Sequence, residues 1–166
     1  MRTRAAVAAL AFSGLLVAPA TAAAPKKITA EGVGEVKLGA THSFLRDRGL
    51  VGVLRPGCEL SGPGTRSARL KAPLSGFVDY TLTNPRKVRS INVRGGAKAR
   101  GVGIGATIAQ IKAKFPKAKV NHDTDEVFGL TFVRIPKDGG GRFTFGVRVD
   151  TGKTEVIGVP FIKTCE

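Results

Sequence analysis

The phrases "VKLGATHSFL" at residues 36–45 and "VGIGATIAQI" at residues 102–111 decide the fold, because the second nearly repeats the first. Each carries an apolar pair, then Gly-Ala-Thr, then an apolar residue four positions after the Thr. Glycine permits a tight corner, and Thr is a favoured helix N-cap. Each phrase therefore predicts a short extended segment that turns into a helix. The alternative is a chance similarity, since the matched residue types are common.

The second phrase predicts the better-defined helix. Gln110 follows Thr107 by three positions, which is the spacing of a capping box. Ile111 and Phe115 lie four positions apart and share a helical face, and Pro116 ends the helix. The first phrase predicts a helix that stops near residue 49, with a weaker cap because it lacks Gln or Glu at the equivalent position. Its residues 44 and 45 are expected to face the core.

Strand-like segments follow each predicted helix. They cover residues 67–71, 76–83 and 87–93 in the first half and 127–135, 142–150 and 154–162 in the second. Apolar residues alternate with polar or small ones over residues 142–149, which predicts one buried and one solvated face. The expected fold class is α+β, with two related halves that each contain a short helix followed by about three antiparallel strands.

The N-terminal residues predict export. Arg2 and Arg4 precede an apolar run over residues 5–18, too short to span a bilayer, and small residues favour cleavage after Ala22. The alternative is an uncleaved membrane anchor. We expect a signal peptide at 1–22, a flexible arm at 23–30 and a single secreted domain at 31–166, with half-units at about 33–98 and 99–166.

Two cysteines, Cys58 and Cys165, predict a disulfide bond, because an even pair in an exported chain is typical of one. The bridge would join the end of the chain to its first half and close a loop of about 107 residues, for which the chain-entropy argument gives roughly 4–5 kcal/mol. The alternative is two unpaired thiols. Neither cysteine belongs to a C-x-x-C motif or has a neighbouring His, so we expect no metal or redox chemistry from them.

Motifs for catalysis and cofactors are weak. "GVGIGA" at 101–106 matches a dinucleotide fingerprint in spelling, but no βαβ context surrounds it. "NHDTDE" at 121–126 gathers acidic residues without the glycine and distal Glu of a calcium loop, so it predicts a solvated turn. We therefore expect no catalytic residue, no cofactor and no metal site.

Charge is the most informative functional feature. The formal net charge is +15, and residues 80–122 contain no Asp or Glu. Such a region attracts anionic polymers and surfaces. Nucleic acid is not expected, because few aromatic residues accompany the basic ones. A surface that is basic only for solubility is the alternative. The candidate anion-binding residues are Arg86, Lys87, Arg89, Arg94, Lys98 and Arg100.

The pattern G-x-V-K-L-G-A-T-x-x-x-L at 34–45 resembles the G-x-x-x-x-G-M-T-x-x-x-V opening of two families, the β-lactamase inhibitor proteins and the outer-membrane assembly lipoproteins. The resemblance implies a helix followed by three or four antiparallel strands, carried twice in the inhibitors, and a partner that is another protein. Here Ala40 and Ala106 replace the Met of the pattern. The chain is also similar to small secreted actinobacterial proteins with a leader, a "RGVGIG" segment and a C-terminal Cys, which implies no particular activity.

The sequence therefore predicts a secreted, non-enzymatic binding module at the cell envelope. Its expected partner is an anionic cell-wall polymer or a membrane surface, bound through the basic residues. The alternative is an exported inhibitor or adaptor that binds another protein.

Overall fold

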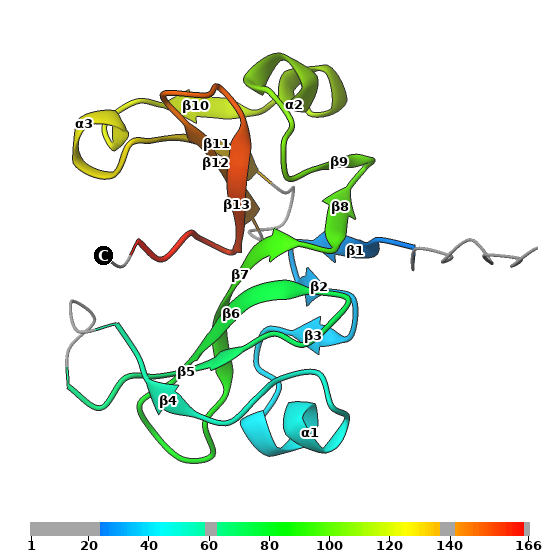
Figure 1. Ribbon diagram of the computed structural model, residues 1–166, viewed down its shortest axis with the longest axis vertical. Coiled ribbons are helices and arrows are strands. Elements are labelled where there is room, and N and C mark those ends of the chain that lie inside the picture. Colours follow the sequence, from blue (N-terminus) through cyan, green and yellow to red (C-terminus); the bar gives the residue numbers. More distant parts are fainter. Residues whose placement is uncertain (1–23, 59–62, 137–141, 165–166) are drawn as a thin grey trace, which may run out of the picture.

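Two β-sheets and three short helices make up the part of the chain that the computed structural model describes, residues 24–58, 63–136 and 142–164 (Figure 1). The fold is mixed α+β and consists mostly of strands, which confirms the expected class. The predicted signal peptide at 1–22 and its cleavage after Ala22 lie outside the described residues.

The larger sheet has eight antiparallel strands in the order β10-β11-β12-β13-β7-β6-β5-β4. They are β4 (Arg55–Pro56), β5 (Arg66–Arg69), β6 (Ser75–Tyr80), β7 (Val88–Gly95), β10 (Lys119–Asn121), β11 (Leu130–Pro136), β12 (Arg142–Arg148) and β13 (Thr154–Val159). Two meanders of four sequential strands meet where β7 pairs with β13, with Asn92 opposite Gly158. The sheet is therefore continuous across both halves of the sequence.

The smaller sheet has five short strands in the order β3-β2-β1-β8-β9. They are β1 (Lys26–Thr29), β2 (Gly32–Val33), β3 (Val36–Lys37), β8 (Ala97–Ala99) and β9 (Val102–Gly103). The predicted flexible arm is wrong over β1, which pairs with β2 on one side and runs parallel to β8 on the other. Ile28, its one large apolar residue, is 3% exposed. The flanking lysines concealed this strand from the sequence pattern.

Helices α1 (His42–Asp47) and α2 (Ile108–Lys114) begin at the two predicted caps. The backbone N–H of Phe44 donates to Thr41 Oγ1 at 3.3 Å. In α2 the N–H of Gln110 donates to Thr107 Oγ1 at 3.3 Å, and the N–H of Thr107 donates to Gln110 Oε1 at 2.9 Å, so the capping box is confirmed. The α1 cap lacks the second of these bonds in the described structure.

One predicted core residue of α1 is solvent-facing. Leu45 is fully buried, but Phe44 is 45% exposed, and the guanidinium of Arg48 lies 4.5 Å from its ring centroid. A helix this short presents one apolar position per turn to the sheet, and Leu45 occupies it.

A third helix, α3 (Asp125–Phe128), replaces the start of a predicted strand. The sequence predicts a solvated turn at 121–126 and a strand at 127–135. The chain instead forms one helical turn that ends at Gly129, whose φ is 62°, before β11 begins. Thr124 Oγ1 donates to the Leu130 carbonyl at 2.6 Å and closes this turn onto β11.

The two strand-to-helix corners attach to the large sheet by the same bonds. The N–H of Gly39 donates to the Val88 carbonyl at 2.9 Å, and the N–H of Gly105 donates to the Thr154 carbonyl at 2.8 Å. Gly39 and Gly105 have φ values of 80° and 83°, which glycine adopts without strain. Each corner therefore directs its helix onto the same side of the large sheet.

A single hydrophobic cluster joins both sheets and both longer helices. It includes Val33 from the small sheet, Leu45 from α1, Ile111 from α2, and Ile91 and Phe145 from the large sheet, all essentially unexposed. The small sheet and the two helices therefore cover one face of the large sheet (Figure 1). Burial of these side chains stabilises the fold by roughly 1.5–3 kcal/mol each.

The opposite face of the large sheet is covered at its centre by residues 160–164. Lys163 Nζ donates to Asp79 Oδ1 at 2.9 Å, and the Lys163 N–H donates to Asn92 Oδ1 at 3.0 Å. A side chain at Gly146 would meet Ile162 at 2.9 Å. The prediction of a solvated face on β12 is therefore wrong at the centre of the strand, where Thr144 and Gly146 are buried, although Arg142 and Arg148 at its ends are exposed.

Candidate functional site

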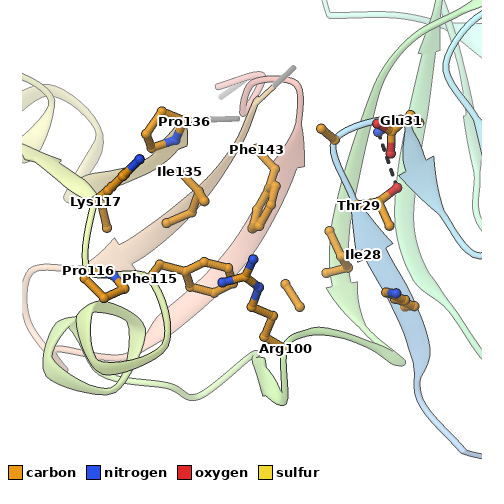
Figure 2. A pocket seen from close by; sticks show the side chains of 14 residues that line it. Ile28, Thr29, Glu31, Arg100, Phe115, Pro116, Lys117, Ile135, Pro136 and Phe143 are labelled. Carbon is orange, nitrogen blue, oxygen red and sulfur yellow. Dashed lines mark hydrogen bonds between the residues drawn. The ribbon is translucent and has the colours of Figure 1, made fainter. Parts of the chain in front are cut away.

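A cavity of about 640 Å³ opens where β1, the β8–β9 turn, the end of α2 and the facing ends of β11 and β12 meet (Figure 2). Its volume lies within the range of sites that hold small molecules. Five separate segments of the chain contribute to its walls, so the folded chain is required to form it.

Apolar side chains form most of the wall. Phe115 and Phe143 meet edge to face with ring centroids 5.6 Å apart, and Ile135 of β11 lies beside them. Ile28 faces them from β1, across the cavity (Figure 2). Small residues complete the lining: Ala30, Ala99 and Ala118. Such a surface favours the apolar part of a ligand.

Arg100 supplies one of the positive charges that line this apolar space. It is the first residue of the two-residue β8–β9 turn, and both Arg100 and Gly101 have positive φ, 47° and 85°. This pattern is that of a type I′ turn, which favours Asn or Gly at the first position. In the described residues no other non-glycine residue has a positive φ.

The Arg100 side chain points back over the aromatic wall. Its Cζ lies 5.3 Å from the centroid of the Phe115 ring, and Figure 2 shows the guanidinium beside that ring. Stacking on an aromatic face holds a guanidinium in place without using up its five N–H donors. The group can therefore receive an anion from the cavity side.

Three lysines belong to the same region as Arg100. Lys27 of β1 and Lys117 line the cavity, and Lys98 of β8 is the registered neighbour of Lys27. Glu31 also lines the cavity, so the charged lining residues in the described part of the chain are three basic and one acidic. We call Lys27, Lys98, Arg100 and Lys117 the basic rim. Like charges on paired strands destabilise a sheet, so an anion bound at the rim would relieve this repulsion.

The structure separates the six predicted anion-binding residues. Lys98 and Arg100 belong to the basic rim, but Arg86, Lys87 and Arg89 lie at the far end of β7. The eight residues of β7 span roughly 25 Å at about 3.3 Å per residue. Arg86 also donates to the carbonyls of residues 64 and 81. The six residues do not form one surface.

Arg94 is engaged in a mixed-charge cluster on the opposite face of the large sheet. Its Nη1 lies 2.6 Å from Glu155 Oε1, and Arg148 contacts both Glu155 and Asp150. Hydrogen bonds from Arg148 lower the pKa of Asp150 below its usual range. The acidic partners offset the charge of Arg94, which makes it a weak candidate for binding an external anion.

The predicted turn at 121–126 holds its acidic residues by local bonds. His122 Nδ1 and Asp125 Oδ2 are 2.8 Å apart, and Thr131 Oγ1 donates to Asp125 Oδ1 at 2.8 Å. The hydrogen bond to His122 is the main reason why the pKa of Asp125 is lowered. Within the described ranges, no group of three His, Cys, Asp or Glu residues could hold a metal ion.

Half-buried His42 of α1 contacts the buried Tyr80 of β6. The rings meet edge to face with centroids 5.4 Å apart, and His42 Nε2 lies 3.1 Å from the Gly52 carbonyl. Burial, with a smaller effect of Asp79, raises the pKa of the Tyr80 hydroxyl well above its usual value. The hydroxyl has no hydrogen-bond partner in the described structure. This pair packs α1 against β6.

Cys58 is half-buried, and its carbonyl accepts a bond from Thr65 Oγ1 at 3.2 Å. Cys165 lies outside the described residues, so the disulfide stays a prediction. The docking of Lys163 onto β6 and β7 carries the C-terminal segment to the half of the molecule that contains Cys58. This placement is compatible with the predicted bridge.

Sequence reasoning did not connect Lys27 or Lys117 with Lys98 and Arg100. Lys27 was assigned to the flexible arm, and no local pattern shows that the chain after α2 approaches β1. One signal was present: alignment of the two phrases places Arg100 opposite Gly34, whose φ is 56°. An arginine at a position that suits glycine is unusual enough to mark a site.

Comparisons with other proteins find no matching family model, no matching curated protein and no matching solved structure. Over the described part of the chain, no helix is long and apolar enough to cross a membrane.

Proposed function

We propose that this chain is a non-enzymatic binding module that holds an anionic partner at the basic rim. The observation that carries the proposal is the meeting of Lys27, Arg100 and Lys117, from three separate segments, around one cavity, with Lys98 beside them. Basic side chains gathered at one place raise the local concentration of anions far more than the same charges spread over a surface. The strongly positive net charge of +15 adds long-range attraction.

Export to the cell envelope is part of this proposal. The apolar run at 5–18, the small residues before Ala22 and the pair of cysteines support it. An envelope offers anionic polymers and anionic lipid head groups as partners. Mass spectrometry of the exported protein should give an N-terminus at Ala23 and a mass two hydrogens below that of the reduced chain. Retention of residues 1–22 would contradict export by this route.

The proposed module consists of two related half-units, about 33–98 and 99–166. The strand pair β2·β3 aligns Gly32 with Lys37, and β8·β9 aligns Lys98 with Gly103, exactly one repeat length later. The register shift of β6·β7 between Asp79 and Tyr80 lies within one residue of the aligned position of the shift in β12·β13 between Gly146 and Val147. These matches support the resemblance to the two-unit inhibitor architecture. A crystal structure whose halves fail to superpose would contradict this construction.

Two matched triple variants test the binding site. The rim variant is Lys27→Gln, Lys98→Gln and Lys117→Gln, and the control is Lys71→Gln, Lys87→Gln and Arg89→Gln at exposed positions away from the cavity. Both remove three positive charges, so they differ only in where the charges lie. The rim variant should elute from an immobilised polyphosphate column at clearly lower salt than the control variant. Equal elution would mean that only net charge matters, and the proposed site would be wrong.

The alternative partner is another protein, and one observation favours it. Val53 and Leu54 are 52% and 36% exposed, and Leu54 lines a hollow with Pro85 and Arg86 at the α1 end. Exposed apolar residues near a hollow are typical of protein contacts. An inhibitor or adaptor should retain one protein at a fixed ratio in moderate salt. Loss of that retention in Leu54→Ser, with the rim variant unaffected, would favour this alternative over the basic rim.

A further inference from the structure

We propose that the cavity binds a single-chain amphiphile that carries a carboxylate, with its apolar chain against Phe115, Phe143 and Ile28 and its head group at Arg100. The inference rests on the proposed function through Arg100, which belongs to the basic rim. It goes further because it assigns the apolar cavity beside the rim as the binding site for a second, uncharged part of the ligand.

The cavity has two chemically different parts, and this division defines the ligand. The aromatic and aliphatic wall offers no charge to an anion, so a small hydrophilic anion would leave most of the 640 Å³ unused. A purely apolar ligand would leave the guanidinium of Arg100 without a partner beside it. A molecule with an apolar chain and one anionic end satisfies both parts.

The backbone of Arg100 provides an independent argument. Its φ of 47° is a conformation in which L side chains are strained, and Gly34 occupies the corresponding place in the other half. Asn or Gly would suit the β8–β9 turn better. The turn nevertheless places a guanidinium over the Phe115 ring, 5.3 Å from its centroid. Strain that persists at the mouth of a cavity is typical of a functional residue.

The charges around the mouth favour an anionic head group over a cationic one. Among the described residues that line the cavity, Arg100, Lys27 and Lys117 are basic and Glu31 is acidic. A carboxylate can accept two parallel N–H bonds from a guanidinium, a charge-assisted arrangement that also fixes the orientation of the head group. A planar carboxylate also fits beside a guanidinium that is already stacked on a ring.

Titration calorimetry with four probes tests the proposal on the full exported chain: decanoate below its micellar concentration, decanol, decylammonium and acetate. Decanoate should bind most tightly, decanol more weakly, and decylammonium and acetate without measurable heat. Arg100→Asn should weaken decanoate binding about tenfold or more and leave decanol binding within about twofold. Arg100→Lys should recover part of the loss, because it retains the charge but not the planar fork.

A second pair of variants tests the apolar part. Ala118→Phe should fill the cavity and abolish binding of both decanoate and decanol, whereas Ala113→Phe, on the exposed side of α2, should bind both as the unchanged chain does. Thermal melts identify any variant that fails to fold. If Ala118→Phe fails to fold, Arg100→Asn still tests the proposal, because Asn suits the turn and this variant is expected to fold.

The outcomes separate this inference from the proposed function. If decanoate fails to bind while the rim variant still elutes from the polyphosphate column at lower salt than the control variant, the cavity proposal is overturned. The proposed binding module then stands. If decanoate binds through Arg100 while the rim and control variants elute together, the amphiphile site stands and polymer binding falls. Equal binding of decanoate and decanol, unaffected by Arg100→Asn, would also overturn the proposal.

Discussion

Arg100 combines an unfavourable backbone with a favourable side-chain position. A left-handed conformation costs a non-glycine residue about 1–2 kcal/mol, while an exposed guanidinium stacked on an aromatic ring contributes about 0.5–1 kcal/mol. The two terms leave a net destabilisation, so stability alone does not account for this residue. Gly34, with φ 56° in the β2–β3 turn, bears no such strain.

Replacement at these two positions should change stability in opposite directions. Arg100→Asn is expected to unfold at equal or higher urea concentration, with a gain of up to about 1 kcal/mol. Gly34→Ala is expected to lower the free energy of unfolding by about 1–2 kcal/mol, because its φ is positive and a Cβ would lie 3.4 Å from Lys26. Urea unfolding curves measure both, and a clear loss of stability in Arg100→Asn would contradict the strain argument.

The short helices depend on their caps, since neither is long enough to be stable by itself. Thr107 and Gln110 satisfy two backbone donors of α2, and Thr41 satisfies one in α1. Thr107→Ala should lower the free energy of unfolding by about 1 kcal/mol. Gln110→Ala should lower the free energy of unfolding by about 0.5 kcal/mol, because it removes one exposed hydrogen bond, and such bonds contribute least to stability. If both substitutions leave the unfolding curve unchanged, these caps do not stabilise the fold.

The sequence was sufficient for the elements whose signals are local. The Gly-Ala-Thr corners, the capping box of α2 and the cores of β6, β7, β12 and β13 follow from spacing and alternation over a few residues. Strand β1 was missed because two lysines precede its single buried residue, and α3 because a four-residue helix has no periodicity to read. Both depend on partners that lie far away in the sequence.

The candidate site was only half predictable for the same reason. Lys98 and Arg100 stood out because a long stretch around them lacks acidic residues. Their grouping with Lys27 and Lys117 depends on the parallel pairing of β1 with β8, which joins residues about 70 positions apart. The aromatic wall behind them depends on the large sheet. Arg86 and Lys87 share the same composition signal, yet the length of β7 separates them from the rim.

At the scale of the whole molecule, residues 160–164 join the two halves a second time. The β7·β13 pairing is the first connection, and the buried pair of Lys163 with Asp79 is the second. The side chains of Lys163 and Asp79 are only 14% and 5% exposed, and Ser90 Oγ donates to the other carboxylate oxygen at 3.1 Å. Removing one member of a buried ion pair leaves the other charge without compensation.

A double-mutant cycle on this pair tests the connection. Lys163→Met should lower the free energy of unfolding by about 3–5 kcal/mol, because the Asp79 carboxylate then stays buried with one hydroxyl donor. The double variant Asp79→Asn with Lys163→Met should be destabilised by less than the sum of the single effects, by about 1 kcal/mol or more. Urea unfolding of the four chains gives the coupling energy. Strict additivity would show that the pair does not act as a unit.

The salt dependence of polyphosphate binding, measured by fluorescence anisotropy at several salt concentrations, tests the central claim most directly. Each basic contact to a flexible polyanion contributes about 0.7 to the slope of log K against log salt. The triple variant at Lys27, Lys98 and Lys117 should therefore flatten the slope by about 2, while the triple variant at Lys71, Lys87 and Arg89 should leave it unchanged. Equal slopes in the two variants would contradict an anion site at the basic rim.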